Sequence, residues 1–216
     1  MGSESDGILS GLIRFSHEKL GLTPNQISTV GFVVGMIAAV LFARGFAMAG
    51  LIALAVSQII DGLDGGVARR YNLQSRKGQR LEIIYDRLNE LAIFLALSYA
   101  GHTSFLMAIL AFAAILLATA VQPLSHFDPG FKRFMIYLGY LATVLFNVRG
   151  FELAIHVIFF ANLTTFIVGT IMVDYRLQGE IDTQAIIRRE AERQMGVALP
   201  AEDPPSLLTY LFKLFS

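Results

Sequence analysis

Five carboxylates in one short part of the sequence are spaced as they would be on helices. Asp61 and Asp64 are three residues apart. Glu82, Asp86 and Glu90 follow at intervals of four. Each set lies on one face of a helix, so two helix ends could direct carboxylates toward each other across the connecting loop. Two carboxylate charges 4 Å apart repel by about 4 kcal/mol at an effective dielectric constant near 20. The cluster therefore requires either bound protons or cations among the acids.

Cations would explain the choice of residue types. Oxygen ligands without nitrogen or sulfur suit hard divalent ions such as Mg²⁺, Mn²⁺ or Ca²⁺, and four carboxylates balance the formal charge of two such ions. A pair of dications can stabilise both the attacking and the leaving oxygen of an in-line displacement at phosphorus. Protonated acids would instead suit a proton relay inside a membrane.

Small residues adjoin the acids on the first of these two helices. Gly62, Gly65 and Gly66, with Ala68 close behind, leave a helix face almost without side chains. Such a face permits either close approach by a bulky ligand or tight packing against another membrane helix. In the company of the carboxylates and Arg69, we favour the ligand cleft.

The composition indicates that these helices lie in a membrane. Of the 216 residues, 55% are hydrophobic and 16% are charged, and the mean hydropathy is +0.59. A hydrocarbon core about 30 Å thick needs roughly 20 apolar residues per helix, and short loops between consecutive apolar runs favour helices over a β-barrel. We therefore predict an all-α polytopic membrane protein with six transmembrane helices, at about 27–45, 49–69, 80–100, 103–123, 132–148 and 151–174.

The predicted spans divide the chain into three regions. Residues 1–26 form an N-terminal arm with an amphipathic interfacial helix, and residues 27–174 form the six-helix membrane domain. Residues 175–216 form a cytoplasmic tail, in which we expect a surface helix over 183–195. Its end over 205–216 is either a second amphipathic interfacial segment or a frayed tail that packs nowhere. The polar start MGSESDG lacks a basic region followed by an apolar core, so no cleavable signal peptide is expected.

Positive charge is distributed unequally between the two sides of the predicted spans. Arg44 and Arg149 fall on one side, whereas most other Lys and Arg residues fall on the side of the acids and of both termini. Because cytoplasmic loops retain positive charge, we predict a multi-pass protein of the cell membrane with cytoplasmic termini and an acidic cluster at the cytoplasmic face. The absence of cysteine excludes disulfides and thiolate sites. A formal charge of zero gives no sign of a nucleic-acid partner, and none is expected.

The acids belong to a longer pattern of defined positions. Written with its spacing, this pattern is Asp61-x2-Asp64-Gly65-x2-Ala68-Arg69-x8-Gly78-x3-Glu82-x3-Asp86. It resembles the signature of the CDP-alcohol phosphotransferase (CDP-alcohol phosphatidyltransferase) family, D-x2-D-G-x2-A-R-x7-8-G-x3-D-x3-D. The one departure is Glu82, where that family has Asp. The segment LTPNQIS before the first span and the six spans with cytoplasmic ends are also similar to the family's arrangement.

The resemblance implies an integral-membrane enzyme of phospholipid biosynthesis. Such an enzyme transfers a phospho-alcohol group from a CDP-linked donor to an acceptor alcohol and releases CMP. A cleft at the bilayer edge can hold lipid chains between helices while a small polar alcohol enters from the cytosol, so we favour a CDP-lipid donor and a phosphatidyl group. The resemblance also implies a homodimer, with residues 27–174 as the catalytic domain.

Roles for single residues follow from the same resemblance. Two divalent cations, Mg²⁺ or Mn²⁺, would be held by Asp61, Asp64, Glu82 and Asp86. Asp86 would also be the general base toward the acceptor hydroxyl. The residues that match CDP-binding positions are Asp61, Gly65, Ala68, Arg69 and Gly78.

Basic residues near the predicted cleft offer a site for a phosphate on the acceptor. These candidates are Arg76, Lys77, Lys132 and Arg133. They could equally be ordinary cytoplasmic anchors of the membrane spans. His126 and Asp128 lie in the same loop as the last two.

Other classes of protein also use acids inside a membrane. A membrane prenyltransferase places its two acidic motifs on widely separated helices, whereas the clusters here lie on consecutive helices. A cation or proton transporter usually holds its site near the middle of the membrane, whereas these acids lie at one edge beside basic residues. A catalytically altered pseudoenzyme is a further alternative, because Glu82 adds a methylene to a predicted metal ligand.

The departure at position 82 can be tested directly. We expect Glu82→Asp to preserve or improve turnover, because it restores the family's residue while keeping the charge and the oxygen ligands. The measurement is metal-dependent release of CMP by the purified protein. Loss of that activity would show that the second acidic helix is aligned wrongly with the family pattern.

Overall fold

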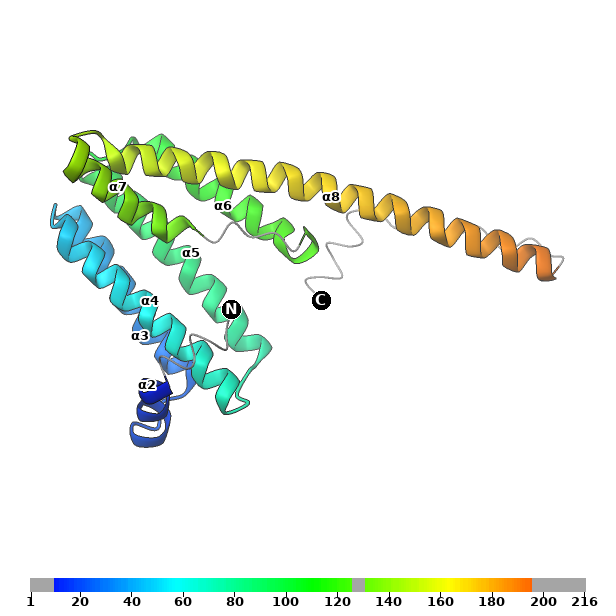
Figure 1. Cartoon of the computed structure of the whole chain (residues 1–216), viewed down its shortest axis with the longest axis horizontal. Coiled ribbons are helices and arrows are strands. Elements are labelled where there is room, and N and C mark those ends of the chain that lie inside the picture. The colour runs from blue at the N-terminus through cyan, green and yellow to red at the C-terminus, as the bar shows by residue number, and fades with distance from the viewer. Residues whose placement is uncertain (1–9, 126–130, 196–216) are drawn as a thin grey trace. The chain divides into compact units, whose positions relative to one another are not determined.

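The computed structural model describes residues 10–125 and 131–195, and within these ranges the chain forms helices joined by short turns, with no strand (Figure 1). Its elements are α2 (Ser10–Arg14), the π-helical turn η1 (Phe15–Lys19), α3 (Pro24–Ala43), α4 (Ala47–Arg70), α5 (Arg76–Tyr99), α6 (Phe105–Ser125), α7 (Lys132–Phe146) and α8 (Gly150–Met195). Each of the six predicted spans falls on one helix, from α3 to α8 in order. The all-α prediction is confirmed for the described residues.

Four helices in the described part of the chain are long and apolar enough to cross a membrane. They are α3, α4, the Phe105–Gln122 part of α6 and the Gly150–Tyr175 part of α8. By contrast, α5 carries the acids and several basic residues, and α7 has only 15 residues. Charge and length, respectively, keep these two helices below the usual requirement for a span. The six-span count and the orientation in the membrane stay predictions.

The chain divides into two compact units. The first combines Met1–Leu116 with Phe131–Phe160, and the second combines Leu117–Gly130 with Ala161–Ser216. The first unit therefore contains α2 to α5, α7 and parts of α6 and α8. Every residue predicted for metal, nucleotide or phosphate binding belongs to this first unit.

The predicted tail begins inside α8. This helix continues without interruption to Met195, so the surface helix predicted over 183–195 is the end of α8. The amphipathic end predicted over 205–216, together with His126 and Asp128, lies outside the described residues.

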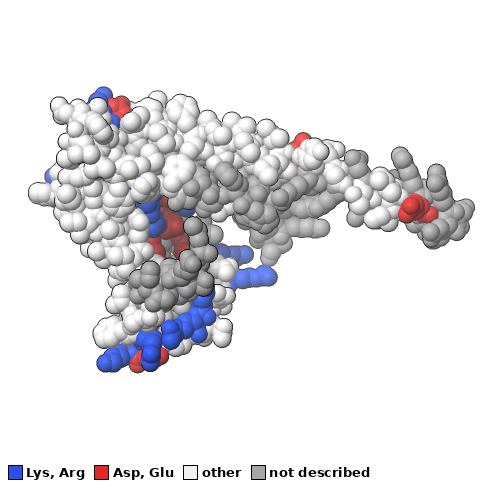
Figure 2. Space-filling view, in the orientation of Figure 1, with Lys and Arg blue, Asp and Glu red and all other residues white. Residues whose placement is uncertain are grey.

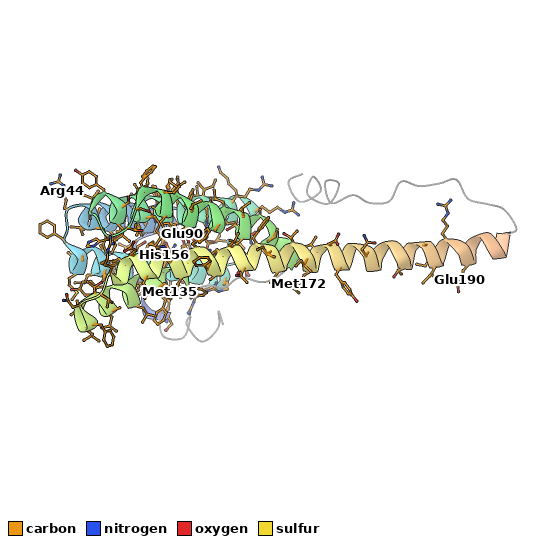
Figure 3. All side chains as sticks on the ribbon, turned by 90° about the horizontal axis from the view of Figure 1, so that it is seen from above. Arg44, Glu90, Met135, His156, Met172 and Glu190 are labelled. Atoms are coloured by element: carbon orange, nitrogen blue, oxygen red, sulfur yellow. The ribbon has the colours of Figure 1, made fainter. Side chains whose placement is uncertain are left out.

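A buried apolar cluster joins the helices of the first unit. Because lipid tails are as apolar as these side chains, close packing stabilises such contacts more than removal from water does. Several members are alanines, which let the helix backbones approach one another. Figure 3 shows Met135 and His156 among these helices and Arg44 at their end. The cluster comprises Ala38, Ala39, Phe42, Leu51, Leu54, Ile93, Phe94, Ala96, Leu97, Ala108, Ala111, Ile115, Ile136, Phe151, Ile155 and Ile158.

The segment LTPNQIS fixes the beginning of α3. Thr23 is the N-cap, where its hydroxyl accepts a hydrogen bond from the Gln26 N–H at 3.4 Å. The Gln26 side-chain oxygen accepts in return from the Thr23 N–H at 2.9 Å. Pro24 occupies the first helical position, where a missing N–H costs nothing. This start places Asn25 and Ser28 in the first turns of α3, beside the acidic helices.

The N-terminal helix α2 and the turn η1 pack near the C-terminal end of α4. The Tyr71 hydroxyl, just after α4, donates a hydrogen bond of 2.8 Å to the Glu18 carboxylate, which lowers the pKa of Glu18. Leu12 and Phe15 are exposed, as expected for an amphipathic helix. Its position at the membrane interface stays a prediction. Ile13 lies in a second buried cluster, with Ile27, Leu63 and Val67.

Two glycines allow α7 and α8 to meet closely. A Cβ atom on Gly139 would lie 2.8 Å from the Gly150 carbonyl oxygen and 2.9 Å from the Ala154 Cβ. A Cβ on Gly150 would in turn lie 2.8 Å from the Thr143 amide nitrogen. Since these neighbours are backbone or short side chains, neither position has room for a larger residue.

This contact predicts an effect on stability. We expect Gly139→Ala to lower the thermal unfolding temperature in detergent, because relieving such a clash typically costs about 1–3 kcal/mol. The matched control is Gly179→Ala in the same type of helix, where an added Cβ meets nothing within 4 Å. That control should be neutral or stabilising, because Ala is the better helix former. Equal unfolding temperatures for the two variants would contradict the close α7–α8 contact.

Candidate active site

The structure brings the predicted acids of α4 and α5 into one cluster. Asp61 and Asp64 come from the second half of α4, and Glu82 and Asp86 come from the first half of α5. Asp61 and Asp86 repel each other electrostatically, and so do Asp64 and Glu82. The spacing of the sequence therefore predicted correctly that the two helices direct their carboxylates toward each other.

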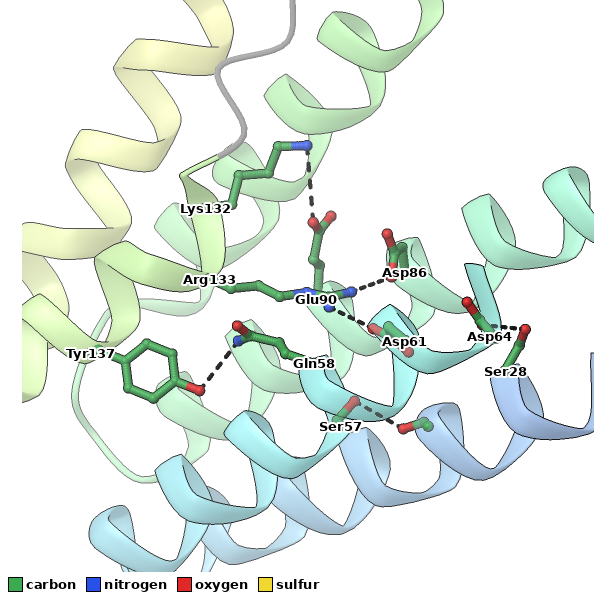
Figure 4. Close-up of polar contacts among 11 residues, drawn as sticks. Ser28, Ser57, Gln58, Asp61, Asp64, Asp86, Glu90, Lys132, Arg133 and Tyr137 are labelled. Atoms are coloured by element: carbon green, nitrogen blue, oxygen red, sulfur yellow. Dashed lines mark hydrogen bonds and ion pairs between the residues drawn. The ribbon is translucent and has the colours of Figure 1, made fainter. Parts of the chain in front are cut away.

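Arg133 supplies the positive charge between two of these acids. Its Nη1 atom lies 2.6 Å from Asp61 Oδ2, and its Nη2 atom pairs with Asp86 Oδ1 (Figure 4). One guanidinium from α7 therefore links α4 to α5. The planar fork of arginine suits this double contact, which a lysine ammonium could not reproduce.

A second ion-pair group lies one turn further along α5. Glu90 has a side chain only 7% exposed, and it pairs with Arg87 at 2.8 Å. Lys132 at the start of α7 approaches the same carboxylate at 4.0 Å (Figure 4). The side chains of Lys132 and Arg133, both predicted from sequence to lie near the cleft, thus both reach acids on α5.

Polar contacts that the sequence did not reveal hold α7 beside α4. The Gln58 side chain donates a hydrogen bond of 3.2 Å to the Tyr137 hydroxyl. Tyr137 donates in turn to the Leu51 carbonyl oxygen at 3.4 Å. Gln58 precedes Asp61 by three residues and Tyr137 follows Arg133 by four, so helical spacing from known site residues could have found both.

Helix α3 contacts the cluster from its other side. Ser28 donates a hydrogen bond to Asp64, whose side chain is almost wholly buried. A Cβ atom on Gly31 would lie 2.6 Å from Asp61 Oδ1, so only glycine leaves room for that carboxylate. Ser57 ties the helices together by donating a 2.9 Å hydrogen bond to the Gly31 carbonyl oxygen. Sequence reasoning did not identify Ser28 or Gly31.

An open pocket adjoins the acidic cluster. Its volume is about 150 Å³, less than the roughly 300–1,000 Å³ of an enclosed small-molecule site, and it opens to solvent. Six predicted site residues line it: Asp64, Gly65, Ala68, Arg69, Gly78 and Glu82. The other lining residues are Pro24, Asn25, Ser28, Leu73, Gln74, Ser75 and Gln79.

Local structure explains the shape of this pocket. Ser75 is the N-cap of α5, and its hydroxyl accepts a hydrogen bond from the Gly78 N–H at 3.0 Å. A Cβ atom on Gly78 would come within 3.0 Å of Asn25 Oδ1. A Cβ on Gly65 would lie 3.1 Å from Arg69 Nη1. These glycines therefore keep the walls close together around the open space.

The predicted site residues fall into three groups. Asp64 and Glu82 lie on the pocket side, with four of the five predicted CDP-binding residues. Asp61 does not line the pocket and instead pairs with Arg133, as Asp86 does. Arg76 and Lys77 are exposed at the start of α5 and do not line the pocket either. Figure 2 shows acidic side chains recessed beside basic ones, with further basic side chains projecting near the ends of α4 and α5.

The acidic cluster offers the kind of donor atoms that divalent cations bind. The atoms that it offers to a cation are all carboxylate oxygens, which hard dications prefer. Asp61 and Asp86 are close enough to share one cationic group. With Arg133 in that position, the described residues form no group of three or more metal-ligating side chains. The donor atoms fit a divalent ion, and Arg133 lies between two of the predicted ligands, Asp61 and Asp86.

Comparisons with known proteins agree on one family. A family model described as CDP-alcohol phosphatidyltransferase matches residues 21–172. The archaetidylinositol phosphate synthase of Pyrococcus horikoshii is 36% identical over 83 residues, which cover 38% of this chain and 44% of that protein. The enzyme of the same name from Methanothermobacter thermautotrophicus is 32% identical over 105 residues, covering 49% and 54%. The matches thus span about half the length of these curated relatives.

Solved structures show the same fold. The phosphatidylinositol phosphate synthase of Mycobacterium tuberculosis in apo form superimposes with a TM-score of 0.65 at 19% identity, covering 76% of this chain and 94% of that one. The same protein with CDP-DAG bound gives a TM-score of 0.64 at 18% identity, covering 78% and 92%. A third structure is a complex with manganese and citrate, again with a TM-score of 0.64 at 18% identity, covering 78% and 88%. At such identities the likeness shows a shared fold.

The contact between α4 and α7 gives a test of the site's support. Tyr137→Phe removes the hydroxyl that Gln58 contacts, and loss of such a partly buried hydrogen bond costs about 0.5–1.5 kcal/mol. We expect a lower thermal unfolding temperature in detergent. The matched control is Tyr140→Phe on the same helix, because Tyr140 contacts Phe151 through its ring and the substitution keeps that ring. An equal effect of both variants would argue against a structural role for the Gln58–Tyr137 hydrogen bond.

Proposed function

The chain belongs to the CDP-alcohol phosphatidyltransferase family, and we propose that it transfers a phosphatidyl-type group from a CDP-linked lipid to a small polar alcohol, with release of CMP. The main support for this proposal is that the four motif acids form two pairs, one beside the pocket and one beside Arg133. Asp64 and Glu82 adjoin the pocket, and Asp61 and Asp86 face a cationic side chain on α7. A donor in the pocket and an acceptor on the α7 side would meet at the acids between them.

The pocket suits the CDP part of such a donor. Its glycine-lined walls admit a flat or bulky group, and Arg69 offers positive charge to a pyrophosphate. Amide and hydroxyl groups of Asn25, Gln74 and Ser75 offer polar partners to a nucleotide. The Mycobacterium tuberculosis relative has been solved with CDP-DAG bound, which supports a lipid donor for this chain.

Asp61, Asp64, Glu82 and Asp86 would hold two divalent cations, Mg²⁺ or Mn²⁺. When bound, such ions neutralise charge on the phosphoryl oxygens and on the leaving group. The manganese complex of the same relative supports this choice of ion. Glu82, with its longer side chain, would contribute its oxygens from the pocket side.

Asp86 would act on the acceptor. Its carboxylate accepts the proton of the acceptor hydroxyl, and the acceptor oxygen forms a bond to the β-phosphorus of the donor. The bond between that phosphorus and the bridging oxygen breaks, and CMP departs with the electron pair. The products are a phosphodiester lipid, CMP and one proton.

The acceptor is proposed to be a polyol that carries a phosphate, such as an inositol phosphate. Lys132 and Arg133 lie at the start of α7 beside Glu90, Asp61 and Asp86, where a phosphate on the acceptor would find positive charge. Arg76 and Lys77 at the exposed start of α5 are a second candidate group. The names of the archaeal relatives, archaetidylinositol phosphate synthases, support the same class of acceptor. A cytoplasmic active site and a homodimer remain part of the proposal.

The proposal predicts a loss of activity without loss of structure. Purified protein would be incubated with CDP-diacylglycerol, Mg²⁺ or Mn²⁺ and a panel of alcohols that includes inositol phosphate, glycerol phosphate, serine and inositol, and CMP would be measured. Asp86→Asn should reduce CMP release by at least about a hundredfold, because it removes a general base. The variant should still elute from gel filtration as the wild type does.

A matched control separates this effect from a general loss of charge. Glu152 is a partly exposed acid that pairs with Arg149 at 2.8 Å, far along the chain from the cluster. Glu152→Gln should leave CMP release unchanged. Wild-type CMP release by Asp86→Asn, or no CMP release by the wild type with any alcohol, would refute the proposed function and leave the transporter or pseudoenzyme alternatives.

A further inference from the structure

Arg133 makes contacts that are unusual for a residue expected to bind a substrate phosphate. Its guanidinium is engaged by Asp61 through Nη1 and by Asp86 through Nη2. Both carboxylates belong to the set proposed to hold divalent cations. The arginine is therefore paired with the cluster's own acids, at the place where positive charge is needed.

The surrounding structure holds Arg133 in this position. One turn further along α7, Tyr137 contacts Gln58 of α4 at 3.2 Å. The adjacent Lys132 approaches Glu90 of α5 at 4.0 Å. The Arg133 side chain is only 22% exposed, so water compensates poorly for a lost partner. The arginine is fixed by contacts on both sides of it along α7.

A divalent cation competes with the guanidinium for the carboxylate oxygens that Arg133 contacts, Asp61 Oδ2 and Asp86 Oδ1. Each oxygen that coordinates a metal at about 2.0–2.2 Å would bring the ion against the arginine nitrogens, and two positive charges so close repel strongly. A metal ion bound through these two oxygens therefore requires Arg133 to leave at least one of them.

We propose that Arg133 is a resident counter-cation of the acidic cluster, which holds Asp61 and Asp86 together in the metal-free protein and is released when a divalent cation binds. This inference rests on the proposed metal site. It assigns Arg133 a positioning role before catalysis, in addition to any contact with the acceptor. It also implies that metal binding and release of a cationic group on α7 occur together.

The competition has a measurable consequence. If the arrangement with Arg133 released is populated to about 10% in the metal-free protein, the apparent metal affinity is reduced about tenfold. Removal of the guanidinium should therefore strengthen metal binding. It should also leave Asp61 and Asp86 without a counter-charge when no metal is present, which lowers stability.

The test uses the full chain in detergent, stripped with EDTA, and requires no enzymatic turnover. Mn²⁺ binding is followed through the electron paramagnetic resonance signal of the free ion, and thermal unfolding is followed with and without Mn²⁺. Arg133→Gln should bind Mn²⁺ about tenfold more tightly than the wild type. Its unfolding temperature should be lower in EDTA and should rise more on addition of Mn²⁺ than that of the wild type.

Arg87→Gln is the matched control. It removes a partly buried arginine next to Asp86 in the chain, but its ion pair is with Glu90, outside the proposed metal ligands. Its Mn²⁺ affinity should stay within about twofold of the wild type, as expected for an independent site. An equal gain in Mn²⁺ affinity for the two variants would show a general charge effect and overturn the proposal.

Arg133→Lys keeps the charge but cannot bridge two carboxylates with a planar fork. It should bind Mn²⁺ with an affinity between those of the wild type and Arg133→Gln. It replaces the glutamine variant in the test if that variant unfolds when metal is removed. Unchanged or weaker Mn²⁺ binding in either variant would overturn the proposal. If the wild type binds Mn²⁺ and releases CMP, such a result leaves the proposed function intact. If neither the wild type nor any variant binds Mn²⁺, both the proposed metal site and the proposed release of Arg133 are refuted.

Discussion

Like-charged carboxylates gathered in a poorly solvated place need positive charge among them, and this requirement organises the first unit of the chain. Asp61, Asp64, Glu82 and Asp86 repel one another across α4 and α5, and Arg69 of α4 attracts only part of this group, at Glu82. At Asp61 and Asp86 the positive charge comes from α7, through Arg133. A helix distant in sequence is thus bound to the cluster by electrostatics as well as by packing.

Small and polar residues of α3 let this helix lie close to both acidic helices, α4 and α5. Gly31 on α3 leaves space for the Asp61 carboxylate, and Gly35 similarly adjoins the side chain of Asn89 on α5. Ser28 donates a hydrogen bond to Asp64 from the same face of α3. Small residues on α3 therefore let both acidic helices approach, and short polar side chains hold them there. This is the expected use of small and polar residues where helices pack inside a membrane.

The sequence predicted the helices and the acidic cluster because both depend on local spacing. Apolar runs mark the helices, and intervals of three and four place acids on one face. The partners of those acids depend on which helices pack together, and spacing along one helix carries no such information. Arg133 was therefore expected near the cleft as a phosphate ligand, but its contacts with Asp61 and Asp86 were not foreseen. Ser28 was missed for the same reason. Spacing places Gln58 and Tyr137 on the same helix faces as Asp61 and Arg133, but it does not show that the two contact each other.

Glu82, the predicted departure from the family pattern, lies where the structure leaves most room for a longer side chain. Asp64 is almost wholly buried against Ser28, and Asp61 abuts Gly31, so an added methylene at either position would collide with α3. Glu82 is instead exposed and lines the open pocket, where a longer side chain can take another rotamer without moving a helix. The replacement thus changes the reach of the acid most open to solvent, and leaves unchanged the acids that fix the spacing of α3, α4, α5 and α7. The physical cost of Glu at this position is therefore a matter of ligand placement in the pocket and not of the stability of the helix bundle.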